Sequence, residues 1–309
     1  MIISSLTNLN LRRLVPRSAA LARRTLATHD ARGESQYEDY DKTSQTYDAY
    51  RAPIGVEIFR RGFAEVAART NQSTNDLHLM DAGCGSGNHL DLLQHDVGSI
   101  AGLEINNGML DKCRAKLSSS ADIRQGSITD MPFEDESADV VITTQVLHHL
   151  ETGGDLSFPN VAAASREVFR CLRPGGSWII QCQTPEQHVD GFWWSPIVPV
   201  AAAKLATRFP SLVKFEELCR AAGFNEFDSE IPSEPLVRLD MYLDLEGPFD
   251  ERFRNADSTW SLATEAELES GLTMLRRKID NGTAEKWLHE REELRAQIGQ
   301  TTTVIVSKV

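Results

Sequence analysis

The chain has 309 residues, of which 41% are hydrophobic, so it is long enough for one α/β domain with an additional cap. Its formal net charge is −13, which disfavours a nucleic acid as substrate, because phosphate contacts need basic patches. No apolar run approaches the roughly 20 residues of a membrane span.

Residues 1–33 differ in composition from the rest of the chain. The first 29 residues contain five arginines, several serines and leucines, and no acidic residue. Such an acid-free, arginine-rich leader is typical of an organellar transit peptide, although an unstructured basic tail has the same composition. We expect a transit peptide and a mitochondrial location, with the plastid and the cytoplasm as alternatives.

Residues 36–69 have a helical pattern that is interrupted near Pro53 and Gly55. We therefore expect residues 34–76 to form an N-terminal helical cap that precedes the first strand of the core.

Residues 79–89 are the most informative segment. An apolar run, a turn with three glycines and a helical pattern follow one another, which predicts a strand, a tight turn and a helix. Gly83, Gly85 and Gly87 lack side chains where a backbone must approach a ligand closely, and the turn leads to the positive end of a helix. This arrangement suits a nucleotide-like cofactor.

The spacing of the glycines indicates which cofactor. In a dinucleotide-binding fingerprint the third glycine would fall at position 88 or 90, and these positions hold Asn88 and Leu90, which disfavours NAD. Asp81 lies two residues before the first glycine and would repel a pyrophosphate. S-adenosylmethionine carries an ammonium and a sulfonium and has no phosphate, so the motif favours this cofactor.

A second strand is expected at residues 99–105, with Glu104 near its end. Glu104 follows Gly83 by 21 residues, close to the spacing at which a strand-end acid binds ribose hydroxyls. A solvated acid at a strand end is the alternative interpretation.

Residues 138–150 predict a buried strand that enters a helix, since Val140–Ile142 is apolar and β-branched. Gln145 is expected where this strand opens towards cofactor and substrate. His148 is a candidate base, because histidine titrates near neutrality, and a structural role is the alternative. Next come a helix at 166–172, a turn at 173–176 and a strand at 177–182.

The C-terminal part is expected to complete a sheet. A helix at 211–222 precedes a strand at 224–231, and the last strand is expected at 302–307. Between these strands the chain looks mostly helical, including residues 264–279 and 283–297. We therefore expect a core over 77–235, a helical lid over 236–300 joined by the loop around 185–210, and a last core strand over 301–309.

The lid also contains candidate residues for substrate binding. Several acids there could bind a cationic acceptor, although most suit a solvated face. Its aromatic and apolar side chains could line a substrate site, and packing within the lid explains them equally well: Phe192, Trp193, Trp194, Met241, Tyr242 and Trp260.

Five motifs in this order, from the glycine turn to the Leu-x-Pro-Gly-Gly segment, resemble the class I S-adenosylmethionine-dependent methyltransferases of the small-molecule type. The resemblance covers roughly residues 36–231. It implies an α/β fold, a Rossmann-like three-layer sandwich around a mostly parallel seven-stranded sheet with an antiparallel last strand, to which the helical lid is added.

The resemblance also implies site residues. Tyr47 and Arg51 match the N-terminal element that contacts the cofactor carboxylate, and Ser127 replaces the family's adenine-binding aspartate. The implied cofactor-binding residues are Tyr47, Arg51, Asp81, Gly83, Gly85, Gly87, Glu104, Ile105, Ser127, Ile128 and Gln145, and the candidate catalytic residues are Gln145 and His148.

The expected activity is methyl transfer from S-adenosylmethionine to an oxygen, nitrogen or sulfur atom of a small molecule by in-line displacement. The five cysteines form no C-x-x-C pair and no metal-ligand spacing, so we expect reduced thiols, an intracellular compartment and no metal. The alternatives are quinone-biosynthesis methylation, methylation of a protein side chain, and an organellar assembly or binding protein without catalysis.

Overall fold

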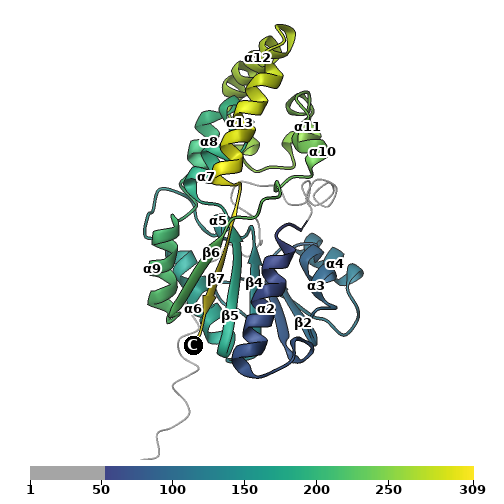
Figure 1. Ribbon diagram of the computed structural model, residues 1–309, viewed down its shortest axis with the longest axis vertical. Helices are drawn as coiled ribbons and strands as arrows, with labels where there is room; N and C mark the ends of the chain where they lie inside the picture. The colour runs from purple at the N-terminus through teal and green to yellow at the C-terminus, as the bar shows by residue number, and fades with distance from the viewer. Residues whose placement is uncertain (1–52) are drawn as a thin grey trace, which may run out of the picture. The chain divides into compact units, whose positions relative to one another are not determined.

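The computed structural model describes residues 53–309 (Figure 1). The expected leader and the candidate residues Tyr47 and Arg51 lie outside the described residues, so their roles stay predictions.

A seven-stranded sheet forms the centre of the described chain (Figure 1). Its order is β3-β2-β1-β4-β5-β7-β6, and β7 runs antiparallel to both of its neighbours. This confirms the predicted Rossmann-like sheet with an antiparallel last strand. The strands are β1 (His78–Ala82), β2 (Ser99–Glu104), β3 (Asp122–Gln125), β4 (Ala138–Thr144), β5 (Leu172–Cys182), β6 (Glu226–Glu230) and β7 (Thr302–Ser307).

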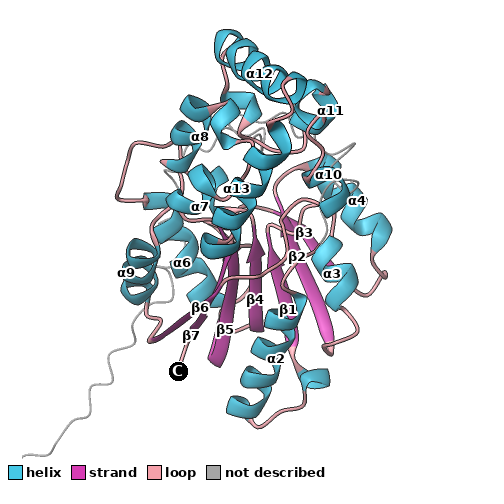
Figure 2. Cartoon of the chain, turned by 45° about the horizontal axis from the view of Figure 1, so that its top comes forward, coloured by secondary structure: helices cyan, strands magenta, loops and turns pink. Residues whose placement is uncertain are grey.

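Helices cover both faces of the sheet, as a three-layer sandwich requires (Figure 2). One face carries α2 (Val56–Thr70), α3 (Asn88–Leu93) and α4 (Asn107–Lys116), which bury Phe59, Leu90 and their neighbours against the strands. The other face carries α6 (Pro159–Cys171) and α9 (Leu212–Ala222) over a second cluster around Trp178. The strands between these layers are therefore apolar on both sides.

The strand order reverses between β1 and β4. From β1 the chain continues to β2 and β3 on one side, and from β4 it continues to β5 on the other. Ligands of open α/β sheets bind in the crevice outside the carboxyl ends of the strands at such a reversal. The reversal therefore places the candidate site at the ends of β1 and β4.

The predicted turn at residues 173–176 is wrong in one respect, because β5 already begins at Leu172. The pairing with β4 runs from Ala138↔Leu172 to Val140↔Ser177, so β5 accommodates additional residues as an irregular bulge. Gly175 adopts a φ of 84° there, and its N–H donates to the Lys308 carbonyl at 2.7 Å. The Pro-Gly-Gly segment thus bends a strand instead of ending it.

A helical lid follows from two separate segments of the chain. The first contains α7 (Pro185–Asp190) and α8 (Pro199–Ala206), and the second contains α10 (Leu239–Tyr242), α11 (Glu251–Arg254), α12 (Glu265–Asp280) and α13 (Ala284–Ile298). Figures 1 and 2 show these helices grouped beyond one end of the strands, and Figure 1 shows the short α5 (Leu147–Leu150) below them.

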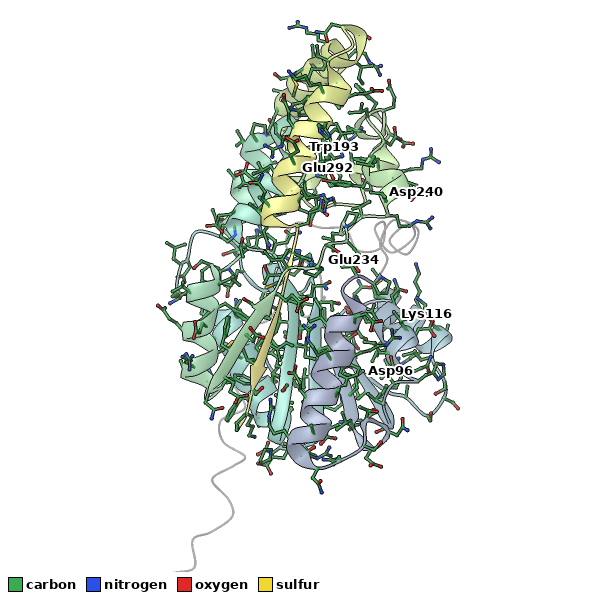
Figure 3. The ribbon with its side chains drawn as sticks, in the orientation of Figure 1. Asp96, Lys116, Trp193, Glu234, Asp240 and Glu292 are labelled. Carbon is green, nitrogen blue, oxygen red and sulfur yellow. The ribbon has the colours of Figure 1, made fainter. Side chains whose placement is uncertain are left out.

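The lid has its own hydrophobic core, which accounts for the aromatic residues singled out in its sequence. Phe192, Trp193, Trp194, Tyr242 and Trp260 are all buried in one cluster, and Met241 packs against it. The Tyr242 hydroxyl donates to Glu292 at 2.7 Å, and Figure 3 shows Trp193 and Glu292 together within the lid. These aromatic residues therefore pack the lid, and the structure gives them no open face towards a substrate.

Buried hydrogen bonds fasten the lid to the strand ends. Gln187 of α7 accepts from the Thr302 hydroxyl at the start of β7 at 3.2 Å, and the Leu236 N–H donates to Gln300, two residues before β7, at 2.7 Å. Because both lid segments are tied to the start of β7 and the residues before it, the lid and this end of the sheet form one packed unit.

One glycine of α12 permits close packing inside the lid, and we predict that Gly271→Ala destabilises the protein. A Cβ at Gly271 would lie 1.9 Å from the Ile197 carbonyl oxygen, so backbone would have to move. Overpacking of this kind lowers the free energy of unfolding by about 1–3 kcal/mol, measurable by urea denaturation. The exposed neighbour Ser270→Ala is the control and is expected within about 0.5 kcal/mol of wild type. Equal stabilities of the two variants would contradict the prediction.

Candidate functional site

The glycine turn links β1 to the end of β2. The N–H groups of Gly83 and Cys84 donate to the Leu103 carbonyl at 2.8 and 2.9 Å. A Cβ at Gly83 would lie 2.3 Å from Val146, whereas a Cβ at Gly85 would meet no atom within 4 Å. The turn is therefore packed against the end of β4 on one side and leaves its backbone open at Gly85.

Glu104 is held by the same turn. Its carboxylate accepts the Gly85 N–H at 2.9 Å on one oxygen and the Asn106 N–H at 2.8 Å on the other. Burial raises the pKa of Glu104, and the backbone hydrogen bonds oppose this by stabilising the charged form. Each carboxylate oxygen retains a further lone pair for a ligand hydroxyl.

Asp81 is the most unusual side chain of the site. It is 1% exposed, and neither carboxylate oxygen has a hydrogen-bond partner in the part of the chain that the structure describes. Burial, followed by the nearby Cys113 and Glu104, raises the pKa of Asp81 well above its ordinary value. Buried polar groups nearly always have partners, so this carboxylate is the place where a ligand donor is missing.

The end of β4 positions the two candidate catalytic residues differently. Gln145 has a φ of 55°, an uncommon conformation for a residue other than glycine, and its side-chain amide donates to Thr301 at 3.1 Å. His148 is buried, with its ring 3.9 Å from His149 and 4.8 Å from Phe209 between ring centroids. The Gln145 amide thus joins the end of β4 to the residue just before β7, and His148 packs among rings, so a catalytic role for either stays a prediction.

The expected adenine side lies after β3. The Gly126 N–H donates to the Glu104 carbonyl at 3.1 Å, which brings this loop to the end of β2. The Ser127 hydroxyl lies 2.8 Å from that of Thr129, Ile128 is buried, and Ile105 is exposed. Ser127 therefore already has a local partner, and Ile105 offers an apolar surface at the rim.

His89 also belongs to this site, although it is not among the residues predicted from the sequence. It lies in the first turn of α3, and its Nδ1 is 3.3 Å from the Thr144 hydroxyl at the end of β4. Burial lowers the pKa of His89 to about 4, so the ring is neutral at neutral pH. Its position two residues after the third glycine is the signal that points to it.

The described residues were also compared with the expectations on thiols, metal ligands and membrane spans. All five cysteines are free thiols, and residues 53–309 contain no group of three His, Cys, Asp or Glu side chains arranged to hold a metal ion. Within the same range, no helix has the length and apolar character needed to cross a membrane.

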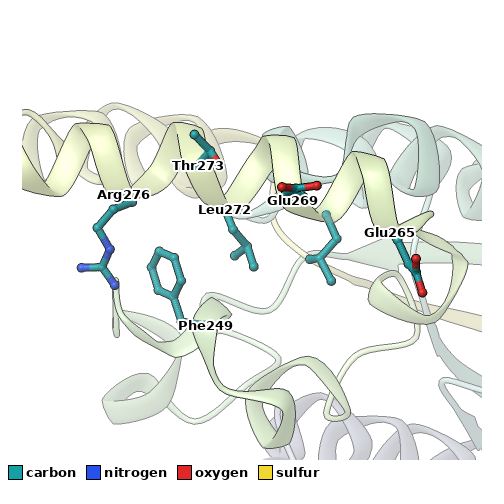
Figure 4. Close-up of a pocket in the computed structure, with 7 residues that line it drawn as sticks. Phe249, Glu265, Glu269, Leu272, Thr273 and Arg276 are labelled. Carbon is teal, nitrogen blue, oxygen red and sulfur yellow. The ribbon is translucent and has the colours of Figure 1, made fainter.

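A groove of about 440 Å³ lies on the lid alone (Figure 4). It is lined by Phe249 and one side of α12, and Arg276 covers the Phe249 ring at 4.1 Å while it pairs with Glu246 at 2.7 Å. All of its lining residues belong to the lid and none to the strands or their covering helices, so this groove is not part of the candidate site.

The residues at the crevice fit S-adenosylmethionine. The unpartnered Asp81 carboxylate suits an ammonium group, Glu104 retains lone pairs for two ribose hydroxyls, and the open backbone at Gly85 allows close approach. The fold and the site together define a Rossmann-like nucleotide-cofactor protein with a preference for a cationic ligand.

Comparison with known proteins supports an S-adenosylmethionine site in this crevice. Residues 80–180 match the family model described as "Methyltransferase domain". The demethylmenaquinone methyltransferase of Symbiobacterium thermophilum is 26% identical over 225 residues, covering 63% of this chain and 86% of that protein. A probable S-adenosylmethionine-dependent methyltransferase of Mycolicibacterium smegmatis is 30% identical over 151 residues, covering 49% of this chain and 53% of that protein.

A solved structure supports the fold. The putative methyltransferase from an antibiotic biosynthesis pathway of Anabaena variabilis superposes with a TM-score of 0.63 at 16% identity, covering 83% of this chain and 98% of that one. The family match over residues 80–180 and the similar proteins, and not the structural likeness, identify the methyltransferase domain as class I and S-adenosylmethionine-dependent, with S-adenosyl-L-methionine as its cofactor.

We predict that Asp81→Asn weakens cofactor binding without disturbing the fold. Removing one partner of a buried charge pair costs about 2 kcal/mol or more, which corresponds to a loss of affinity of at least about 30-fold. Calorimetric titration of S-adenosylmethionine measures the loss. Asp228→Asn, an exposed site on β6, makes the same change in net charge and is expected to bind like wild type. Unchanged affinity in Asp81→Asn would contradict the assignment.

Without ligand, the same variant is expected to change how stability depends on pH. The unfolded chain loses the Asp81 proton near 3.8, whereas the folded chain keeps it to a much higher pH. The folded state binds more protons in this window, so the stability that this group contributes falls as the pH rises. Urea denaturation should therefore show that Asp81→Asn gains stability relative to wild type between pH 4 and pH 7. A constant difference would contradict the raised pKa.

Proposed function

We propose that the enzyme methylates an oxygen, nitrogen or sulfur atom of a small molecule that is enclosed between the crevice and the lid. The observation that carries this proposal is that the lid is fastened at the end of the sheet where Asp81 and Glu104 lie, since the Thr302 hydroxyl of β7 donates to Gln187 of α7 at 3.2 Å. Gln145 at the end of β4 donates to Thr301, and Thr301 in turn donates to the Cys182 carbonyl at 2.8 Å. A macromolecular acceptor needs strand ends that are open to solvent. Strand ends that a lid covers suit a small acceptor.

Buried amides and hydroxyls lie where the lid meets the strands. Gln181, Gln183 and Thr301 are at most 4% exposed there, and the Gln181 amide donates to the Ile54 carbonyl at 3.1 Å. A site surrounded by amides and hydroxyls favours an acceptor that is neutral and forms hydrogen bonds.

The chain's own residues would provide binding and orientation. Asp81 would hold the ammonium group of the cofactor, Glu104 its ribose hydroxyls, and the lid would exclude water. When bound, S-adenosylmethionine supplies an activated methyl group for in-line displacement, so alignment provides much of the rate acceleration. Gln145 and His148 are the proposed catalytic residues, and Tyr47 and Arg51 are proposed to bind the cofactor carboxylate.

A second candidate is methylation in quinone biosynthesis. The relatives named demethylmenaquinone methyltransferase include one from Lactococcus lactis, which is 27% identical over 216 residues, covering 62% of this chain and 82% of that protein. Alignment over most of such relatives favours a ring-bearing acceptor as a second hypothesis. The composition of residues 1–33 supports a mitochondrial location for either function.

Transfer of a radiolabelled methyl group tests the proposal. The full chain is incubated with labelled S-adenosylmethionine and a panel of phenols, primary amines, thiols and a demethylated naphthoquinol, and Asp81→Asn and Asp228→Asn serve as variant and control. We expect label on a small acceptor with wild type and Asp228→Asn, and a strong loss with Asp81→Asn. Absence of label from every acceptor of the panel with the wild type would contradict the proposal.

A further inference from the structure

His89 spans the crevice at the reversal of strand order. Its backbone belongs to α3, which follows the glycine turn of β1, and its ring reaches the Thr144 hydroxyl at the end of β4. β1 and β4 are neighbours in the sheet, paired at Asp81↔Ile142, and Thr144 lies two residues beyond Ile142. The ring therefore lies where ligands of this fold bind.

One nitrogen of this ring has no partner. Nε2 is buried and forms no hydrogen bond with any residue between 53 and 309. The ring of Phe59 on α2 lies beside it, with the centroids 5.7 Å apart, and this ring offers no conventional acceptor or donor. His188, another buried histidine, has partners near both nitrogens, Gln183 at 2.7 Å and Thr259 at 3.4 Å. A buried histidine of this chain can thus have partners near both nitrogens, as His188 does, and Nε2 of His89 has none among the described residues.

We propose that Nε2 of His89 accepts a hydrogen bond from the nucleophile of the methyl acceptor, which is therefore a hydroxyl or an amine. This inference rests on the proposed function and assigns a catalytic residue to it. A nucleophile must direct its lone pair at the methyl carbon, so its proton must point elsewhere, to an acceptor within hydrogen-bond reach. Nε2 provides that acceptor.

The role fixes the tautomer of the ring. A buried imidazole that is neutral carries one proton, and Nε2 can accept only when that proton is on Nδ1. Nδ1–H then donates to the Thr144 hydroxyl, which the separation of 3.3 Å allows. Thr144 thereby acts as a positioning residue, because it sets both the orientation and the tautomer of His89.

The proton balance of the step is complete. The electron pair of the nucleophile forms the new bond to carbon, the carbon–sulfur pair remains with sulfur, and the proton of the nucleophile passes to Nε2. The net charge of the site is unchanged, because an imidazolium replaces the sulfonium. The low pKa of His89 then favours release of this proton to solvent as the products leave.

Nitrogen NMR of the full chain tests the tautomer without any acceptor. Long-range proton–nitrogen spectra of the labelled protein with S-adenosylhomocysteine are recorded, and His89→Asn identifies the signals of His89. We expect protonated Nδ1 and unprotonated Nε2 at pH 7, and a shift towards protonated Nε2 in Thr144→Val. Protonated Nε2 in the wild type would overturn the proposal.

Kinetics with the acceptor panel test the role. Asn can replace Nδ1 but does not reach the position of Nε2, whereas the side chain of Gln reaches further. We expect His89→Asn to lower kcat between about 10²- and 10⁴-fold, His89→Gln to recover part of the loss, and both to bind S-adenosylmethionine as wild type does. His78→Gln, at the opposite end of β1, is the control and should leave kcat unchanged.

The outcomes separate the two proposals. Loss of cofactor binding and methyl transfer in the wild type would refute the proposed function. Normal binding and transfer with unchanged kcat in His89→Asn would refute the role of His89 alone, as would transfer confined to thiol acceptors.

Discussion

A buried carboxylate without a hydrogen-bond partner is the feature on which the rest of the site depends. Asp81 is the second-last residue of the interior strand β1, between Gly102 of β2 and Ile142 of β4 in the sheet register. A charge in such surroundings is costly unless it is paired, so the ligand-free protein raises the pKa of this group and favours its neutral form. A cationic ligand reverses this preference, which couples the charge of the cofactor to the protonation of the protein.

The reversal of strand order explains why the other groups converge on Asp81. The carboxyl ends of β1, β2 and β4 meet at one edge, so Glu104, the glycine turn and Thr144 come together from distant parts of the sequence. The lid is tied to the same edge through Gln300 and Thr301, directly before β7. Figure 1 shows the lid helices beyond the ends of the strands that carry the site. Binding of the cofactor and enclosure of the acceptor therefore depend on the same end of the sheet.

Most of the fold could be predicted from the sequence because its elements carry local signals. The strand at 302–307 is found at Thr302–Ser307, and the helix at 211–222 is found at Leu212–Ala222 with Gly223 at its end. The bulge at the start of β5 was predicted as a turn, since Pro-Gly-Gly favours turns locally and only pairing with β4 and Lys308 keeps the segment in the sheet. At this segment the tertiary contacts outweigh the local preference for a turn.

The site could be predicted in part, for a similar reason. Glycine spacing and strand-end acids are patterns along the chain, so Asp81, Gly85 and Glu104 could be chosen as candidates. The engagement of the Gln145 amide with Thr301 and the unpartnered Nε2 of His89 depend on contacts between residues far apart in sequence. The aromatic residues of the lid could line a site or fill a core, and only their burial distinguishes the two.

The most direct test of the central claim is a carbon NMR titration of the Asp81 side-chain carboxyl group, with and without S-adenosylhomocysteine, which retains the ammonium group of the cofactor. We predict a pKa well above the ordinary value in the free protein and a marked decrease when the ligand is bound. A pKa that is ordinary in the free protein, or one that the bound ligand leaves unchanged, would contradict the account.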